Sequence, residues 1–202
     1  MHINNVIPII IGAGFFLFLS CSEEKTGNRQ IKIPGHIPGN FYNATDTHLN
    51  KIQDTLFYNN HLFSGYVFAL NDNKDTSLVM GYLNGLQEGM TKKWYPNKQL
   101  AEERLFVHGG KEGTQKGWWE NGKLKFVYHF VNDEYEGLVT EWFNTGKIFR
   151  QFNYVNGHES GSEKMWWDNG TIRANYVIIN GEKFGLSGQK LCVNKNLKLD
   201  IK

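Results

Sequence analysis

The sequence is poor in cysteine and proline, with two cysteines and four prolines among 202 residues. Neither cysteine belongs to a Cys-x-x-Cys pair, and the seven histidines lie far apart, so the short ligand spacing that favours metal sites is missing. We therefore expect no metal and no other cofactor. The few prolines beside 22 glycines exclude a collagen-like or a disordered composition.

A block of charge of one sign is also missing. The 22 basic and 20 acidic residues give a formal net charge of +2 and are interspersed along the chain. Binding to nucleic acid needs a concentrated cationic surface, so we do not expect a nucleic-acid partner. What the chain does have is 14% aromatic residues, which together with the glycines favour many strands joined by tight turns in one domain.

The N-terminus contains an apolar run from Val6 to Leu19, which has the length of a signal-peptide core and is shorter than a membrane span. With the Ser20-Cys21 pair that follows, it resembles the bacterial lipobox. The resemblance implies that residues 1–20 are a lipoprotein signal peptide and that Cys21 carries the lipid. An uncleaved N-terminal anchor helix is the alternative, and it predicts the same side of the membrane.

The residues after Cys21 indicate where such a protein would go. Glu23-Glu24 resembles the acidic export tag of surface lipoproteins of the Bacteroidetes, which predicts an outer-membrane, surface-exposed location in the cell envelope. Residues 21–51 show no sustained periodicity and are predicted to form a membrane tether. If Cys21 is acylated, no intrachain disulfide can form, and we expect Cys192 to be a buried hydrophobic residue.

The rest of the chain is periodic. Glycines recur every 24 residues, at Gly65, Gly89, Gly113, Gly137, Gly161 and Gly185. Pairs of aromatic residues share this period, at Trp94-Tyr95, Trp118-Trp119, Trp142-Phe143 and Trp166-Trp167. Several columns with one period indicate a repeat architecture, in which the aromatic columns are mainly structural and possible binding surfaces.

Two turn signals divide each repeat into two strands. Asn121-Gly122, Thr145-Gly146 and Asn169-Gly170 form one column, and Asn84-Gly85, His108-Gly109, Asn132-Asp133, Asn156-Gly157 and Asn180-Gly181 form the other. Asn-Gly predicts a two-residue hairpin turn in which both residues have positive φ. Residues 52–193 are therefore predicted to be all-β, an elongated, twisted, single-layer antiparallel sheet of about 12 strands. Half units at about residues 52–64 and 185–193 would flank five full repeats, and residues 194–202 would form a tail.

Two segments, GWWENGKLKFVYHF at residues 117–130 and MWWDNGTIRANY at residues 165–176, resemble the MORN-like repeat variant of the bacterial YwqK-type antitoxin family. The resemblance covers about residues 52–193. It implies a repeat scaffold and, from the family label, neutralisation of a toxin by direct binding. An immunity protein of the envelope would agree with both this resemblance and the leader.

Three kinds of function remain open. We favour a protein-interaction or structural scaffold with a protein partner, and we keep an antitoxin or immunity role and the binding of glycan or lipid through exposed aromatics as alternatives. We expect no enzyme, because no nucleophile, base and orienting group share a motif. Glu88, Glu112 and Glu136 are the best candidates for chemistry, but each precedes a repeat glycine, which predicts a solvated turn residue.

Overall fold

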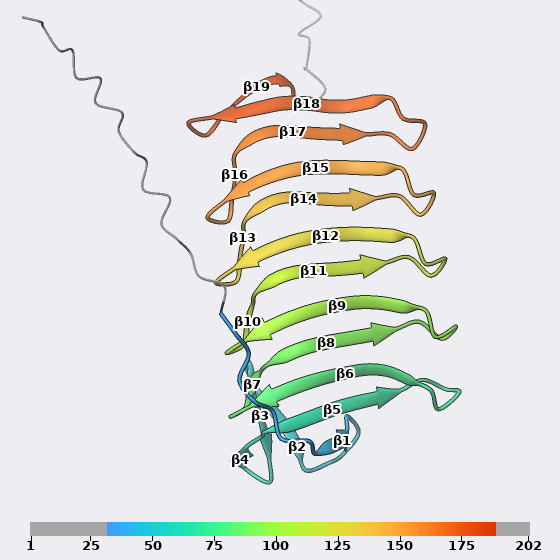
Figure 1. The fold of residues 1–202 in the computed structure, drawn as a ribbon, viewed down its shortest axis with the longest axis vertical. Helices are drawn as coiled ribbons and strands as arrows, with labels where there is room; N and C mark the ends of the chain where they lie inside the picture. The colour runs from blue at the N-terminus through green and yellow to red at the C-terminus, as the bar shows by residue number, and fades with distance from the viewer. Residues whose placement is uncertain (1–31, 189–202) are drawn as a thin grey trace, which may run out of the picture.

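The computed structural model describes residues 32–188, so Cys21, Cys192 and the predicted signal peptide lie outside the described residues. Within this range the chain is all-β, without any helix, and most of it forms one long, open, twisted sheet (Figure 1). The predicted fold class is confirmed. Residues 32–188 contain no helical segment that could span a bilayer.

Hairpins that recur every 24 residues make up most of the sheet. Each has a six-residue strand that begins at a repeat glycine and an eight-residue strand that returns: β5 (Gly65–Leu70) with β6 (Thr76–Leu83), β8 (Gly89–Trp94) with β9 (Leu100–Val107), β11 (Gly113–Trp118) with β12 (Leu124–Val131), β14 (Gly137–Trp142) with β15 (Ile148–Val155), and β17 (Gly161–Trp166) with β18 (Ile172–Ile179). Their order in the sheet follows the sequence, and β19 (Glu182–Leu186) is the last strand described.

Successive hairpins are joined less extensively than the two strands within a hairpin. Six residue pairs join β11 to β12, whereas two pairs, Phe126 with Glu141 and Val127 with Thr140, join β12 to β14. Two-residue strands continue the pairing at the other end of four of the five eight-residue strands: β7 (Leu86–Gln87), β10 (Gly110–Lys111), β13 (Glu134–Tyr135) and β16 (His158–Glu159). The contact between repeats therefore depends strongly on side chains.

The two long edges of the sheet have different turns. We call the edge with the Asn84-Gly85, His108-Gly109, Asn132-Asp133, Asn156-Gly157 and Asn180-Gly181 turns the tight-turn edge. There the prediction is confirmed, because both turn residues have positive φ, for example 50° at Asn84 and 82° at Gly85. We call the opposite edge, with the turns at residues 71–75, 95–99, 119–123, 143–147 and 167–171, the bulge edge.

At the bulge edge the predicted two-residue turn is wrong. Gly122 has a φ of 81°, but Asn121 does not have positive φ. Gly122 N–H donates to the Trp119 carbonyl at 2.8 Å, and Trp119 N–H donates to the Lys123 carbonyl at 2.8 Å, which is a three-residue turn closed by a bulge. The reason is local, because Asn121 Oδ1 accepts the Lys123 N–H at 3.1 Å and so holds the asparagine in an Asx turn.

The bulge recurs at the same place in each hairpin, immediately before the last residue of the six-residue strand, as between Gly117 and Trp118.

One face of the sheet buries its aromatic residues without a second layer. Phe126 is 5% exposed and stacks on Tyr128 with ring centroids 4.4 Å apart. Its ring lies where a side chain at Gly117 would be, so a missing side chain on one strand provides the space for a ring from the next.

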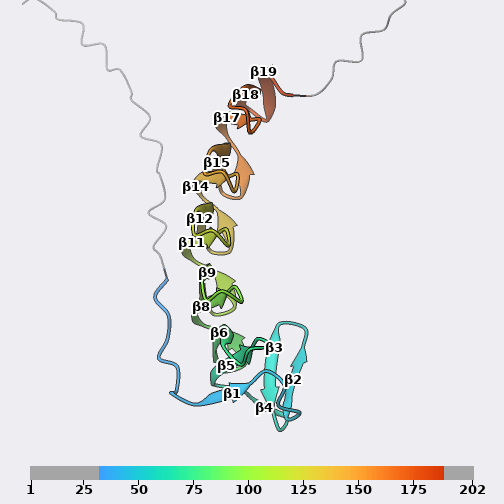
Figure 2. The ribbon, with the colours of Figure 1, turned by 90° about the vertical axis from the view of Figure 1, so that its right-hand side faces the viewer.

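The N-terminal end of the sheet has a cap that differs from the predicted tether and half unit. β1 (Phe41–Asn43) pairs in parallel with β5, which makes twelve strands along the described sheet. β2 (Leu49–Ile52), β3 (Thr55–Tyr58) and β4 (His61–Leu62) form a separate sheet beside it (Figure 2). Aromatic residues explain the difference, because Tyr42 packs on Phe63 at 5.2 Å within a core that also contains Val67 and Tyr82.

Candidate interaction surface

The predicted aromatic pairs lie in a row along the bulge edge, where each tryptophan ends a six-residue strand and its neighbour begins a turn. Seven of the eight are half-buried, and Trp167 is 51% exposed. The row therefore contributes to packing and also presents aromatic surface to solvent, across four repeats.

The second aromatic of a pair connects its repeat to the next one. The Tyr95 hydroxyl donates to the Trp118 carbonyl at 3.0 Å, and Trp119 Nε1 donates to the Trp142 carbonyl at 3.1 Å. The turn asparagines do the same two positions further along the chain, since Asn121 Nδ2 donates to the Asn144 carbonyl at 2.8 Å. These bonds align the rings and fix the spacing of the edge.

Cationic side chains lie over two of these rings. Lys125 Nζ lies 4.6 Å from the ring centroid of Trp119, and the Arg173 guanidinium lies 4.6 Å from that of Trp167. Both cations come six residues after the ring, on the returning strand. In the repeat between them Phe149 takes this position and packs on Phe143 at 5.1 Å. The edge thus combines aromatic area with positive charge, a combination that suits cation–π contacts.

An apolar groove opens between two repeats of this surface. Its volume is about 300 Å³, and it is lined by Trp119, Lys125, Phe126, Tyr128, Glu141, Trp142, Phe143 and Phe149. Three of the predicted aromatic residues, Trp119, Trp142 and Phe143, thus come together with residues from β12, β14 and β15. The repeat columns identified the first three, whereas the others follow only from the strand pairing.

A polar network lies at the inner side of the groove. The Tyr128 hydroxyl donates to Glu141 Oε1 at 2.5 Å, and Arg150 Nη2 donates to the same oxygen at 2.6 Å. Burial raises the pKa of Tyr128 well above its usual range, and the hydrogen bond to Glu141 raises it further. The tyrosine therefore stays protonated near neutral pH, and the network fixes three side chains without creating a base or a nucleophile.

The acidic column differs from its prediction. Glu88 and Glu112 are 0% and 1% exposed, so the expectation of solvated turn residues is wrong for both. Glu88 Oε2 accepts the His108 N–H at 2.7 Å, and Glu112 Oε2 accepts the Asn132 N–H at 3.0 Å. Each carboxylate thus binds the first residue of the tight turn in the next repeat. The sequence shows that the glutamates recur with the repeat, but the backbone N–H groups that they bind can be identified only once the repeats are stacked.

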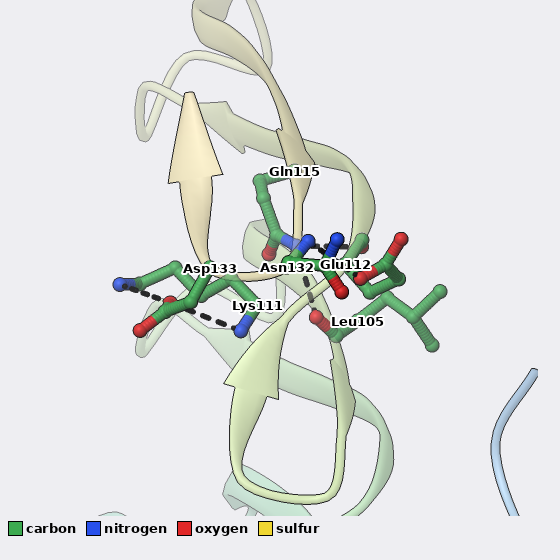
Figure 3. Close-up of polar contacts among 6 residues, drawn as sticks. All are labelled: Leu105, Lys111, Glu112, Gln115, Asn132 and Asp133. Carbon is green, nitrogen blue, oxygen red and sulfur yellow. Dashed lines mark hydrogen bonds and ion pairs between the residues drawn. The ribbon is translucent and has the colours of Figure 1, made fainter. Parts of the chain in front are cut away.

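Figure 3 shows this arrangement around Glu112. Gln115, which is 0% exposed, donates from Nε2 to the Glu112 carbonyl at 3.0 Å and to the Leu105 carbonyl at 2.9 Å. The neighbouring Asp133 accepts the Lys111 N–H at 3.1 Å. Backbone groups at the junction between two repeats are therefore satisfied by side chains, as buried polar groups must be.

The six repeat glycines all have positive φ, from 65° at Gly113 to 150° at Gly65. Five of them begin the six-residue strands, and Gly185 lies in β19. At the glycine that follows each glutamate, this conformation lets the chain bend sharply from a two-residue strand into the six-residue strand that follows it.

Among residues 32–188, no three His, Cys, Asp or Glu side chains cluster in a way that could hold a metal ion.

Comparison with known proteins agrees with the repeat. A family model described as a MORN repeat variant matches three consecutive segments, residues 87–108, 111–132 and 135–156. The three matches start 24 residues apart, and they contain β8 with β9, β11 with β12, and β14 with β15. The predicted MORN-like repeat is confirmed for these segments. No curated protein matches the chain, and no solved structure matches it.

Glu163 is a buried carboxyl group apart from this surface. It is 0% exposed, pairs with Tyr176 across β17 and β18, and accepts the Asn153 N–H at 3.2 Å. Burial raises its pKa to about 7, while the Asn153 bond opposes the rise; Glu159 raises the pKa further, and Lys183 and Arg150 lower it. Its second oxygen has no hydrogen-bond partner within the described part of the chain.

Glu163 should make stability depend on pH. Between its ordinary pKa of 4.5 and the folded value of about 7, the folded chain keeps a proton that the unfolded chain releases. The free energy of unfolding should therefore fall by roughly 3 kcal/mol as the pH rises through this window. Urea unfolding at pH 5 and pH 8 measures this change.

Glu163→Gln is the matched variant, because Gln115 occupies the same column two repeats earlier. It should remove most of the pH dependence between pH 5 and pH 8. An unchanged difference between the two pH values in this variant would show that Glu163 is not the group responsible.

Proposed function

We propose that this chain is a non-enzymatic lipoprotein of the bacterial envelope, anchored through Cys21, whose repeat sheet binds another protein along the bulge edge. The groove between Trp119, Trp142 and Phe149 carries the proposal, because it places an apolar site on an edge that is aromatic in four successive repeats. MORN repeat variants in the central segments are consistent with an interaction or scaffold role. Repeat sheets suit such a role since they present extended surfaces.

The chemistry of the groove supports a protein ligand. Trp, Tyr and Arg are the residue types that contribute most binding energy to protein interfaces. Trp119 and Tyr128 both line the groove, and Arg150 donates a hydrogen bond to Glu141, which also lines it. The tyrosine and the arginine are held by Glu141 before any partner arrives, which reduces the entropy lost on binding. A ligand would therefore meet a largely preformed site.

One narrower version of the proposal and one alternative to it name a different kind of partner. An immunity or antitoxin role makes the partner a toxin, and it requires that loss of this gene be tolerated only when the toxin gene is also lost. Binding of glycan is the second candidate, and the observation that favours it is Trp167, whose side chain is 51% exposed at the end of the row. Quenching of tryptophan fluorescence by cell-wall fragments, and its loss in Trp167→Ala, would identify this second candidate.

The protein-binding site can be located by photocrosslinking in cells. A benzophenone amino acid replaces Phe149, which lines the groove, or Val155, which is 50% exposed at the other end of the same strand. We expect one discrete adduct from position 149 and none from position 155, because only the first lies on the proposed surface. The same adduct from both positions, or none from position 149, would contradict the proposal.

The anchor is tested separately, by labelling cells with radioactive palmitate. Wild type and Cys192→Ala should both incorporate the label, whereas Cys21→Ala should not, because acylation needs the thiol of Cys21. Equal labelling of wild type and Cys21→Ala would remove the lipid anchor from the proposal and leave the protein-binding surface unaffected.

A further inference from the structure

Four of the five tight turns are joined to the preceding repeat by two hydrogen bonds each. The first turn residue donates its N–H to a side chain of that repeat, which is Ser64, Glu88, Glu112 or Glu136. The second turn residue donates its N–H to the carbonyl of the residue just before that side chain, as Gly157 does to Tyr135 at 3.0 Å. The two bonds together hold each turn against its neighbour.

The fifth tight turn, at Asn180-Gly181, makes neither of these bonds. It has the same conformation as the others, with φ of 52° at Asn180 and 82° at Gly181. The position of the glutamates is taken here by Ser160. Among residues 32–188, neither N–H group of this turn has a hydrogen-bond acceptor. The last junction of the sheet therefore has two backbone donors that the earlier junctions use.

A hollow of about 490 Å³ lies at this junction, near the C-terminal end of the sheet in Figure 1. Glu159 and Ser160 line it on the side of the preceding repeat, and Asn180 and Gly181 line it on the side of the turn. These positions correspond to the four residues that the two bonds join in the earlier repeats. The hollow therefore takes the place of those bonds.

The earlier repeats show which chemical group fits this place. A glutamate carboxylate accepts the first N–H of the turn in three of them, and Figure 3 shows this contact between Glu112 and Asn132, at 3.0 Å. Serine has a single side-chain oxygen, which reaches the turn at Ser64 and not at Ser160. A carboxylate has two oxygens, so one such group can accept both N–H groups of a turn.

The other residues of the hollow also favour an anion. Lys183 and His158 both line it. Lys183 Nζ donates to Glu159 Oε2 at 3.1 Å and to the Tyr176 hydroxyl at 3.3 Å, and an ammonium group has three N–H donors. Glu159 lines the hollow too, but this ion pair offsets its charge. Successive backbone N–H groups in a turn, beside a cation, form a concavity that suits an anion.

The hollow has room for more than a bare ion. Its walls include Val155 and Ile178, which offer apolar surface to methylene groups. An acidic side chain places a carboxylate at the end of such groups, as Glu112 does in its own repeat. The planar carboxylate with an aliphatic stem is therefore the ligand that the hollow fits.

We propose that this hollow, between β16 and the turn from β18 to β19, is a binding site for a carboxylate ligand, with one oxygen on the Asn180 N–H and the other on the Gly181 N–H. The ligand connects the last turn to the preceding repeat, as Glu136 connects Asn156. It thereby holds β19, whose side chains are all exposed. The site lies on the tight-turn edge, so it does not depend on the proposed protein-binding groove at the bulge edge.

Amide NMR of the purified full chain tests the site with three probes, which are sodium acetate, the peptide acetyl-Gly-Glu-Gly-amide and its neutral match acetyl-Gly-Gln-Gly-amide. Acetate and the acidic peptide should move the amide proton signals of Asn180 and Gly181 downfield and saturably, because each N–H gains a charged acceptor. The neutral peptide, and sodium chloride at equal ionic strength, should not. Tighter binding of the acidic peptide would identify an acidic side chain as the source, and tighter binding of acetate would identify a small free carboxylate.

Ser160→Glu is the matched variant, because it restores the glutamate of the earlier repeats. Its own carboxylate should fill the hollow, so that the Asn180 N–H exchanges at least about tenfold more slowly than in wild type and acetate binds at least about tenfold more weakly. Ser162→Glu adds the same charge at an exposed position two residues further along β17, and it should change neither quantity.

Three results would overturn the proposal. The first is the absence of a shift at Asn180 and Gly181 with both acetate and the acidic peptide, or an equal shift with the neutral peptide. The second is slow exchange of the Asn180 N–H in wild type without any probe, because the donor would then already have an acceptor. The third is unchanged acetate binding in Ser160→Glu.

Discussion

The hydrogen bonds that join four of the five tight turns to the preceding repeat are the contacts on which the rest of the structure depends. Strand pairing between successive hairpins is limited to two residue pairs at each junction. Ser64, Glu88, Glu112 and Glu136 add a side-chain connection, because each accepts the N–H of the residue twenty positions later. Backbone bonds lie beside them, such as that from the Gly109 N–H to the Gln87 carbonyl at 2.9 Å. These bonds fix the stacking of the hairpins, and the stacking aligns the aromatic row at the other edge.

The two edges therefore have separate tasks. The tight-turn edge is occupied by carboxylates, by turn backbone and by Lys32 and Gly35 of the segment that precedes β1. The bulge edge keeps seven of its eight paired aromatic residues half-buried and contains the groove beside Trp119. Stability in such a sheet is close to a sum over neighbouring repeats, so binding at one edge can coexist with rigid connection at the other.

Much of the fold could be predicted because it repeats. A 24-residue period and Asn-Gly pairs are visible in the sequence, and strand order follows from them. The turn at Asn121-Gly122 could not be predicted from the dipeptide, because Asn-Gly occurs in two-residue turns and also in three-residue turns. The Asx hydrogen bond of Asn121, which favours the three-residue turn here, is visible only in the structure.

The site was harder to predict than the fold. The partners of Glu112 lie twenty and eighty residues away, at Asn132 and Lys32, so its burial exists only after the repeats and the segment have assembled. The aromatic columns were visible, but Tyr128, Glu141 and Arg150 share no column, and only strand pairing brings them together.

The most direct test of the connection between repeats is the amide exchange rate of Asn132, measured with the urea stability in wild type, Glu112→Ser and Glu112→Val. We predict that the Asn132 N–H is protected in wild type and in Glu112→Ser, and exchanges freely in Glu112→Val with a loss of about 1 kcal/mol. Equal protection and equal stability in Glu112→Val would contradict the account.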